Sequence, residues 1–399
     1  MFLKLALHSL LHRRLAAMLT VASIMISTFV VLGVEHIRQE TRNSFSKTVS
    51  GTDLIVGART SQVNLLLYSI FRIGNASANI SWNSYQEIAA MPGIAWSIPL
   101  SLGDSHRGFR VLGTTADYFV HFRYGNNQSL ALLEGRVFNE NPDGYLAILG
   151  AEAAERLGYS TGQTFTLSHG LGDVSFTQHH DHPFTVAGIL APTGTPVDQT
   201  IHVSLASLKA VHHGGPAPDS ITALLIGLES RPDAFAIQRD INNYRPEALL
   251  AIMPGVALME LWQMMSIVEQ VLALIAALVL LAAMLGMTTM LLSTLQQRGR
   301  EIAVLRTLGA SPLFLFALIQ TEALLMTLAG MVLGIATLTA AIMLGNDWIS
   351  SEYGLFVTAR VVGGHTLPYL ISGVMLTLML ACIPATLTYR SSVALRLES

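Results

Sequence analysis

The sequence predicts an α-helical membrane protein with four transmembrane helices and a large α+β extracytoplasmic domain between helices 1 and 2. Three observations predict this fold class. Four apolar runs are long enough to cross a bilayer, only 12% of the 399 residues are charged, and the mean hydropathy is +0.50. More than 200 residues separate the first run from the second, and a segment of that length can bury a core of its own.

The four apolar runs define the predicted spans. Leu15 to Val34 is a run of twenty residues without a charge, and a helix that rises about 1.5 Å per residue needs about 20 apolar residues to cross the hydrocarbon. Because lipid offers no partner for an unpaired amide, the spans are expected to be helical. We predict spans at residues 15–34, 270–295, 313–344 and 367–389.

The distribution of lysine and arginine predicts the orientation. Basic residues lie before the first span, between the second and third, and after the fourth. The positive-inside rule assigns these segments to the cytoplasm. We therefore expect a bacterial inner-membrane protein with both termini in the cytoplasm, and the first span, which lacks a convincing small-residue cleavage site, to be a retained signal anchor. The predicted cytoplasmic segments are residues 1–14 (an amphipathic helix), 296–312 and 390–399, and the outward segments are 35–269 and 345–366.

The outward segment 35–269 is predicted to begin and end with helices that form a stalk. HIRQETRNSFSKTVSG continues the first span without a proline, and Met259, Trp262 and Met265 recur at helical spacing before the second span. Between them, short strands mixed with short helices indicate an α+β domain. The predicted strands are residues 53–56, 94–102, 108–112, 145–149, 164–167, 184–190 and 221–228, and the predicted helices are 62–73, 84–90, 151–157, 203–211 and 233–243.

The loop between the second and third spans is predicted to hold a short surface helix. Ile302, Leu305 and Leu308 recur at helical spacing, so they can face a groove or the bilayer while polar neighbours remain available to a partner. Gly309 is suited to end this helix, and Pro312 discourages its continuation. On spacing alone, a basic helix that only anchors the loop at lipid headgroups is an equal alternative.

The same loop carries a family resemblance. RGREIAVLRTLGAS, residues 298–311, is similar to the cytoplasmic loop of the MacB/FtsX family of ABC transporter permeases. Further segments resemble the macrolide-export and lipoprotein-release members with a MacB-like periplasmic core domain. These segments are LALHSLLHRR (5–14), LIQTEALLMTLAGMVLG (318–334), PATLTYRSSVALRLE (384–398), AILGAEAAERLGYSTGQTFTL (147–167) and FTVAGILAPTGTPVD (184–198).

The resemblance implies a permease that forms a homodimer and docks two copies of a separate ABC ATPase subunit. Family members couple ATP hydrolysis to motion of the periplasmic domain, which is called mechanotransmission. The loop helix would then be the docking surface for the ATPase. Given the resemblance, this interpretation is strongly favoured over a helix that only anchors the loop to lipid. The residues expected to couple to the ATPase are Arg298, Arg300, Glu301, Ile302, Leu305, Arg306 and Gly309.

Two functional classes remain open at this point. The chain is either an exporter permease, with a periplasmic partner protein as an additional subunit, or a relay that transports nothing and activates a periplasmic enzyme or regulator. An outward domain of more than 200 residues is closer to the export type.

The chain itself is not expected to be an enzyme. A P-loop requires G-x-x-x-x-G-K-[ST], and GYSTGQT at residues 158–164 has neither the lysine nor the spacing. H-E-x-x-H and C-x-x-C are absent as well. ATP is therefore expected to bind a partner ATPase and not this chain. The net charge of −3 and the lack of a basic run argue against a nucleic-acid partner, while lipids surround the spans.

Glu322 is the one charged residue inside a predicted span. Carboxylates at this depth usually face the bundle interior or a cavity. It either contributes to the dimer interface or coupling route, or lies near the cytoplasmic end of a tilted span and reaches water. Gly330 and Gly334 form a G-x-x-x-G, which allows close helix approach and weakly favours a dimer seam.

A histidine cluster provides a metal-binding hypothesis. QHHDHP places His179, His180 and His182 beside Asp181 in an outward loop, and His202 lies in the same domain. Imidazole and carboxylate ligands suit zinc, copper or nickel. A zinc-linked transport or sensing assembly is thus a third functional hypothesis, and a solvated polar turn ending at Pro183 is the simpler alternative.

Overall fold

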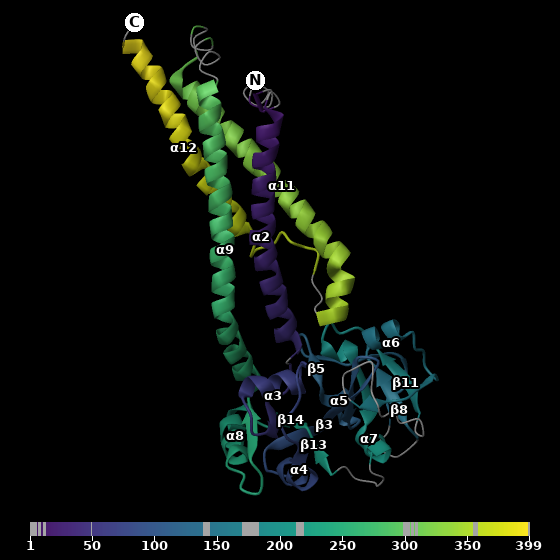
Figure 1. The fold of residues 1–399 in the computed structure, drawn as a ribbon. Helices are drawn as coiled ribbons and strands as arrows, with labels where there is room; N and C mark the ends of the chain where they lie inside the picture. The colour runs from purple at the N-terminus through teal and green to yellow at the C-terminus, as the bar shows by residue number, and fades with distance from the viewer. Residues whose placement is uncertain are drawn as a thin grey trace. The chain divides into compact units, whose positions relative to one another are not determined.

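The computed structural model describes residues 6, 9–10, 13–48, 50–138, 144–169, 183–212, 219–297, 304, 307, 310–353 and 358–397 (Figure 1). The chain divides into two compact units. Unit 1 comprises residues 1–41, 266–350 and 357–399, and unit 2 comprises residues 42–265 and 351–356. We describe each unit by itself.

The described residues of the chain form four helices that are long and apolar enough to cross a membrane. They are α2 (Arg14–Thr48), α9 (Pro254–Gln297), α11 (Pro312–Tyr353) and α12 (Leu367–Leu397). Each of the four predicted spans lies within one of these helices, and every helix extends beyond its span. Pro384 lies inside α12, so this proline does not end the helix.

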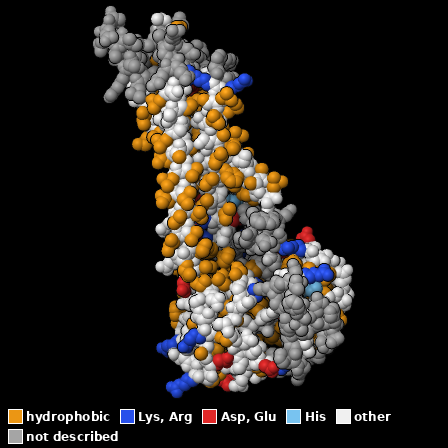
Figure 2. Space-filling view, viewed as in Figure 1, with side chains coloured by type: hydrophobic (Ala, Val, Ile, Leu, Met, Phe, Trp, Pro, Cys, Tyr) orange, Lys and Arg blue, Asp and Glu red, His pale blue; other side chains and the backbone are white. Residues whose placement is uncertain are grey.

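Side chains from all four helices form the core of unit 1. Its buried residues are Ala17 and Ile24 of α2, Met284, Met287 and Leu291 of α9, Ile319, Ala323 and Met326 of α11, and Ala381 and Ala385 of α12. On the face shown in Figure 2, hydrophobic side chains cover the outer surface of the long helices. An apolar exterior is expected of helices whose solvent is lipid.

The two glycines of the G-x-x-x-G pack within the chain, and the weak prediction of a dimer seam at these positions is therefore wrong. A Cβ at Gly330 would lie 2.7 Å from the Cβ of Ile24, and a Cβ at Gly334 would lie 2.9 Å from the carbonyl oxygen of Met25. Small residues allow this close approach. The motif serves the contact between α11 and α2.

Unit 2 is an α+β domain, as predicted, built on one large mixed sheet. Within the described residues the strand order is β15-β1-β14-β3-β4-β12-β8-β11-β7, with β9 beside β11 and β10 beside β3. The pairs β4–β12 and β8–β11 are parallel, and the other pairs are antiparallel. The strands are β1 (Leu54–Ala58), β3 (Ile94–His106), β4 (Phe109–Thr114), β7 (Leu132–Gly135), β8 (Leu146–Leu149), β9 (Thr164–Phe165), β10 (Ser168–His169), β11 (Phe184–Leu190), β12 (Thr200–Ser204), β14 (Ala223–Leu228) and β15 (Leu249–Ile252).

Short helices and two small ribbons complete unit 2. The ribbons pair β2 (Ile80–Ser81) with β13 (Ser220–Ile221) and β5 (Arg123–Tyr124) with β6 (Gln128–Ser129). The helices are α3 (Gln62–Ser69), α4 (Trp82–Ala89), α5 (Asp117–His121), α6 (Ala151–Leu157), α7 (Leu205–His212) and α8 (Ala234–Asn242), with 3₁₀ turns at Pro196–Gln199 and Arg231–Asp233.

Strand β1 shows why the sheet is covered on both faces. All five of its residues are buried. Ile55 contributes to one apolar cluster, and Leu54 and Val56 contribute to another, because successive side chains of a strand point to opposite faces. A continuous apolar run is the pattern expected of a strand buried on both sides.

A close backbone approach joins two of the segments that carry the family resemblance. A Cβ at Gly150, between β8 and α6, would lie 2.2 Å from the carbonyl oxygen of Val197 and 2.3 Å from that of Asp198. The buried Asp198 carboxylate accepts hydrogen bonds from the amides of Thr193 and Gly194. Only glycine fits at position 150, because no side chain can be accommodated there.

Several predicted boundaries are corrected by the structure. Residues 203–204 are strand and not helix, because TIHVS forms β12 between β4 and β8. The predicted helix 62–73 ends at Ser69. The sequence reading missed α5, β7 and β15, which are short and lack a clear period.

The amphipathic face predicted before the second span is also corrected. Trp262 packs against the core of unit 2, where its ring lies 5.6 Å from that of Phe45. Met259 and Met265, however, are 71% and 42% exposed. The buried face of α9 in unit 2 instead carries Ala257, Leu258 and Leu261 beside Trp262.

Candidate functional site

The predicted ATPase-coupling residues lie outside the described residues. This holds for Arg298, Arg300, Glu301, Ile302, Leu305, Arg306 and Gly309. Two neighbours in the same loop, Val304 and Thr307, are described and are helical, and the Thr307 hydroxyl donates to the carbonyl of Val304 at 2.8 Å. Ser311 caps the next helix through its hydroxyl, which accepts from the Phe314 amide at 3.2 Å. Pro312 is therefore the first residue of α11, where a missing amide hydrogen costs nothing.

The three candidate metal ligands His179, His180 and His182 also lie outside the described residues. In the described part of the chain, no three His, Cys, Asp or Glu side chains are grouped so that they can hold a metal ion. His202, from the same domain, is fully buried, and its Nδ1 lies 3.3 Å from the carbonyl oxygen of Ile148. His202 is thus part of the core. Zinc binding by the loop stays a prediction.

The segment 158–162, GYSTG, has the G-x-S-x-G spacing of a hydrolase nucleophile. It follows α6 and precedes β9, which is the reverse of the strand-to-helix order of a nucleophile elbow. Gly158 adopts the left-handed conformation that ends α6, with φ of 67°. This glycine therefore caps a helix, and the geometry gives no support for hydrolase chemistry.

Glu322 is buried inside the helix bundle of a single chain. Only 2% of its surface is exposed, which contradicts the interpretation that it reaches water and also a position on the outer, dimer-forming surface. Neighbouring polar groups on α11 contact α12: the Gln320 amide donates to the Leu378 carbonyl at 3.3 Å, and the hydroxyls of Thr327 and Thr377 lie 3.0 Å apart. A polar layer thus joins α11 to α12 around the depth of Glu322.

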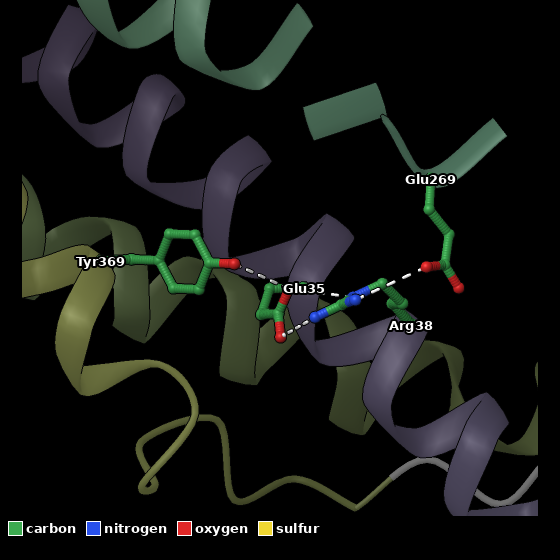
Figure 3. Close-up of polar contacts among 4 residues, drawn as sticks. All are labelled: Glu35, Arg38, Glu269 and Tyr369. Carbon is green, nitrogen blue, oxygen red and sulfur yellow. Dashed lines mark hydrogen bonds and ion pairs between the residues drawn. The ribbon is translucent and has the colours of Figure 1, made fainter. Parts of the chain in front are cut away.

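A second polar group, shown in Figure 3, joins three helices of unit 1. The Arg38 guanidinium donates to both carboxylate oxygens of Glu35, at 2.7 and 3.0 Å, and to Glu269 Oε2 at 3.5 Å. The Tyr369 hydroxyl donates to Glu35 Oε2 at 3.1 Å. We call Glu35, Arg38, Glu269 and Tyr369 the outer polar cluster. It connects α2, α9 and α12.

The segment before α12 adds two contacts to α2. His36 Nε2 lies 2.7 Å from the Thr358 carbonyl oxygen, and the Thr358 amide donates to a Glu40 carboxylate oxygen at 3.4 Å. The Glu35 side chain is 10% exposed and that of Arg38 is 31% exposed. Bonds between charged groups at such partly buried positions are stronger than exposed ion pairs.

The outer polar cluster holds the helix ends in register. Its four side chains are not arranged to cleave a bond. Two carboxylates share one guanidinium, so a displacement of α9 or α12 relative to α2 must break a charged hydrogen bond. Sequence reasoning missed this cluster as a unit. A signal was present, because Glu35 and Glu269 are the first charges beyond the outer ends of spans 1 and 2, and Tyr369 begins span 4 where interfacial aromatics are common.

Comparison with known proteins agrees with this architecture. Residues 17–244 match the family described as MacB-like periplasmic core domain, and residues 273–393 match the FtsX-like permease C-terminal family. No curated protein matches the chain.

Two of the solved structures similar to this chain are a periplasmic region and an extracellular domain. The periplasmic region of MacB from Actinobacillus actinomycetemcomitans is 11% identical, with a TM-score of 0.37 over 54% of this chain and 94% of that one. The extracellular domain of the noncanonic ABC-type transporter YknZ from Gram-positive bacteria is 14% identical, with a TM-score of 0.34. The match covers 50% of this chain and 99% of that one.

The fold and the family matches define a class of protein. Four membrane-spanning helices with a large outward domain between the first two are those of a multi-pass ABC transporter permease. The chain belongs to the MacB/FtsX family of such permeases. Permeases of this family are not themselves enzymes and work with ABC ATPase partners.

Proposed function

We propose that this chain is the permease subunit of an ABC transporter and couples ATP hydrolysis by a separate ATPase to a conformational change of its outward domain. This conformational change either exports a substrate or transmits force to a periplasmic partner protein. The continuity of two helices is the observation that carries the proposal. Helices α2 and α9 each contribute residues both to the membrane-spanning unit and to unit 2.

The ends of these two helices in unit 2 are firmly packed, which supports a role in transmitting force. Phe45 of α2 stacks on Phe71 with a centroid distance of 4.2 Å, and the Arg42 guanidinium lies 5.4 Å from the Trp262 ring of α9. The Gly125 amide donates to the Lys47 carbonyl at 2.7 Å. A displacement of either helix end therefore strains the domain core, because packed interiors transmit strain.

The orientation in the proposal places both termini and the loop 296–312 in the cytoplasm, in a bacterial inner membrane. It rests on the basic residues of these segments. Membrane-impermeant maleimide labelling of single cysteines, in a Cys382→Ser background, tests it. Residues of unit 2 such as Ser220 are expected to react from outside intact cells, whereas Thr307→Cys is expected to react only after permeabilisation.

The coupling role is tested in the full chain reconstituted with its ABC ATPase. Arg306→Glu and Gly309→Pro are expected to leave the protein inserted but to abolish the ATP-dependent change in protease accessibility of unit 2. Arg239→Gln, on the exposed face of α8, is the matched control. If both loop variants retain the ATP-dependent change, the loop does not couple ATPase to permease.

A homodimer is the assembly that the exposed face of α9 supports. Large apolar residues on this face follow heptad spacing, and each is at least 41% exposed. Two copies of such a face can pack by inserting side chains into one another. The seven residues are Met264, Ile267, Val271, Leu274, Leu278, Leu281 and Leu285.

Disulfide cross-linking decides whether this face meets a second copy or only lipid. In a Cys382→Ser background, Leu274→Cys and Leu281→Cys are expected to form dimers on mild oxidation. Leu272→Cys is the control, because Leu272 is 42% exposed and lies off the heptad face. Equal cross-linking at positions 272, 274 and 281 would show that the face has no specific partner.

A further inference from the structure

His106 of unit 2 joins the end of β3 to two segments that follow 53 and 60 residues later in the chain. Only 7% of its surface is exposed. Its Nδ1 lies 2.6 Å from the carbonyl oxygen of Thr166, between β9 and β10, and its Nε2 lies 3.0 Å from the hydroxyl oxygen of Tyr159, just after α6. Both nitrogens of one buried imidazole are therefore engaged, each with a different segment.

The partners of the two nitrogens favour one protonation state. A carbonyl oxygen can only accept, so Nδ1 carries a hydrogen, and in the neutral ring Nε2 then accepts from the Tyr159 hydroxyl. A second proton would occupy the lone pair of Nε2, and the hydroxyl would lose the bond that it donates. The contacts therefore fit neutral His106 better than the imidazolium ion.

Aromatic rings cover the imidazole. The ring centroids of Phe165 and Tyr159 lie 4.8 and 5.8 Å from that of His106. Phe165 is itself buried and stacks on Phe184 of β11. Water has little access to such a position, so an imidazolium ion would lose much of its hydration there.

The charges on neighbouring elements do not reverse this preference. The other titratable groups on the elements around His106 are Tyr159 after α6, Arg156 of α6, Arg107 in the turn after β3, Asp104 of β3 and His169 of β10. Burial lowers the pKa of His106, the hydrogen bond to the Thr166 carbonyl opposes this in part, and the charge of Arg107 lowers the pKa further. His106 is therefore neutral at pH 7.

The segment that His106 contacts has few main-chain bonds of its own. Strands β9 and β10 are each two residues long, and they pair with β11 and β3 respectively. Between them, Phe165 and Leu167 are buried. The bond from His106 to the Thr166 carbonyl lies midway along this segment, so it is a substantial part of the attachment of residues 164–169 to β3.

We propose that His106 is an acid-sensitive clasp in unit 2. At neutral pH it holds residues 164–169 and the turn at Tyr159 to the end of β3, and in acid its protonation loosens both. The role as a sensor of the surroundings rests on the outward location given under the proposed function, because only a domain outside the cytoplasm meets the external pH. The clasp itself depends only on contacts within unit 2.

Hydrogen–deuterium exchange of the full chain in detergent tests the clasp, with rates corrected for the intrinsic effect of pH. Between pH 7 and pH 5, the protection of residues 164–169 is expected to fall several-fold more than that of β1 and β14. The limit for one proton is about tenfold per pH unit. Strands β1 and β14 report the change in global stability, to which His202 contributes.

Three variants assign the response to its residue. His106→Asn keeps a donor near the position of Nδ1 but cannot take up a proton, so the extra fall in protection is expected to disappear. Tyr159→Phe keeps the ring and removes the hydroxyl that favours neutral His106, so the extra fall is expected to shrink. His121→Asn is the matched control, because the His121 ring stacks on Trp96 at 5.3 Å, away from the clasp; it should keep the wild-type response.

Two results would overturn the proposal: an equal loss of protection in residues 164–169 and in β1 and β14, or an extra loss that persists in His106→Asn. If His106→Asn does not fold, Tyr159→Phe decides the question, and an unchanged extra loss in that variant counts against the clasp. The measurement needs neither ATPase nor membrane orientation. Failure of the clasp is therefore distinct from failure of the proposed function, which the maleimide and protease assays test.

Discussion

The contact between α2 and α11 leads to a quantitative prediction for Gly330→Ala. The new Cβ would lie 2.7 Å from the Cβ of Ile24 and 3.1 Å from the Val21 carbonyl oxygen. Nine in ten real Cβ contacts exceed 3.4 Å, so the helices must separate by several tenths of an ångström. Such overpacking costs about 1–3 kcal/mol, and the better helix propensity of alanine returns about 1 kcal/mol.

We therefore expect Gly330→Ala to destabilise unit 1 by up to about 2 kcal/mol, and Gly330→Ala with Gly334→Ala by up to about twice as much. Gly286→Ala is the matched control, because a Cβ at this α9 position meets nothing within 4 Å. The control should be neutral or slightly stabilising.

The assay uses the chain's only cysteine. Cys382 lies in α12, and its sulfur donates to the Leu378 carbonyl at 3.1 Å. A thiol-reactive fluorescent dye thus reports the melting of unit 1 in detergent. If the double glycine variant melts at the same temperature as Gly286→Ala, the α2–α11 contact described above is wrong.

Three further predictions address the outer polar cluster, the domain core and the histidine loop. Arg38→Gln leaves the Glu35 and Glu269 carboxylates without their shared cation, and we expect it to lower the stability of unit 1 by about 1–3 kcal/mol. The melting assay with the thiol-reactive dye measures this loss, with Arg239→Gln as the control. An unchanged melting temperature would show that the cluster is only a surface contact. Burial lowers the folded-state pKa of His202 from 6.5 to about 3, so below pH 6.5 the unfolded chain binds a proton that the folded chain does not. Stability should therefore fall as pH drops from about 6.5 toward 3, by roughly 5 kcal/mol at most. Denaturant titrations across this window should show a shallower slope in His202→Phe, and equal slopes would contradict the assignment. Isothermal titration of the full chain with zinc should lose its heat of binding when the three histidines of QHHDHP become alanine, whereas heats independent of them would remove the zinc hypothesis.

Much of this architecture could be predicted from the sequence, because it depends on local properties. An uncharged run of twenty residues requires a spanning helix whatever its neighbours. Strand β11 and helix α6 begin and end at the predicted residues. The residues that bound them are visible in the chain, because β11 lies between Pro183 and Pro192 and α6 lies between Gly150 and Gly158. The loop motif RGREIAVLRTLGAS indicates the family from a local stretch of the chain alone.

Other features depended on pairings between residues distant in the chain. The outer polar cluster joins Glu35 to Tyr369, residues 334 positions apart, and no local pattern links them. The partner of Gly330 could not be inferred either, because a G-x-x-x-G allows close approach without specifying the second helix. Burial of Glu322 likewise depends on how the four helices pack.

The sequence by itself determined that this chain crosses a membrane four times, carries a large outward domain and belongs with a family of permeases. Hydrophobic length, charge placement and local motifs act within a few turns of the chain, so they can be read directly. Only the tertiary structure decided which helix meets the glycines, which carboxylates share Arg38, and that His202 and Glu322 are buried. Such contacts form when the burial of particular surfaces compensates for the loss of chain entropy on folding. Which surfaces are buried depends on the whole molecule.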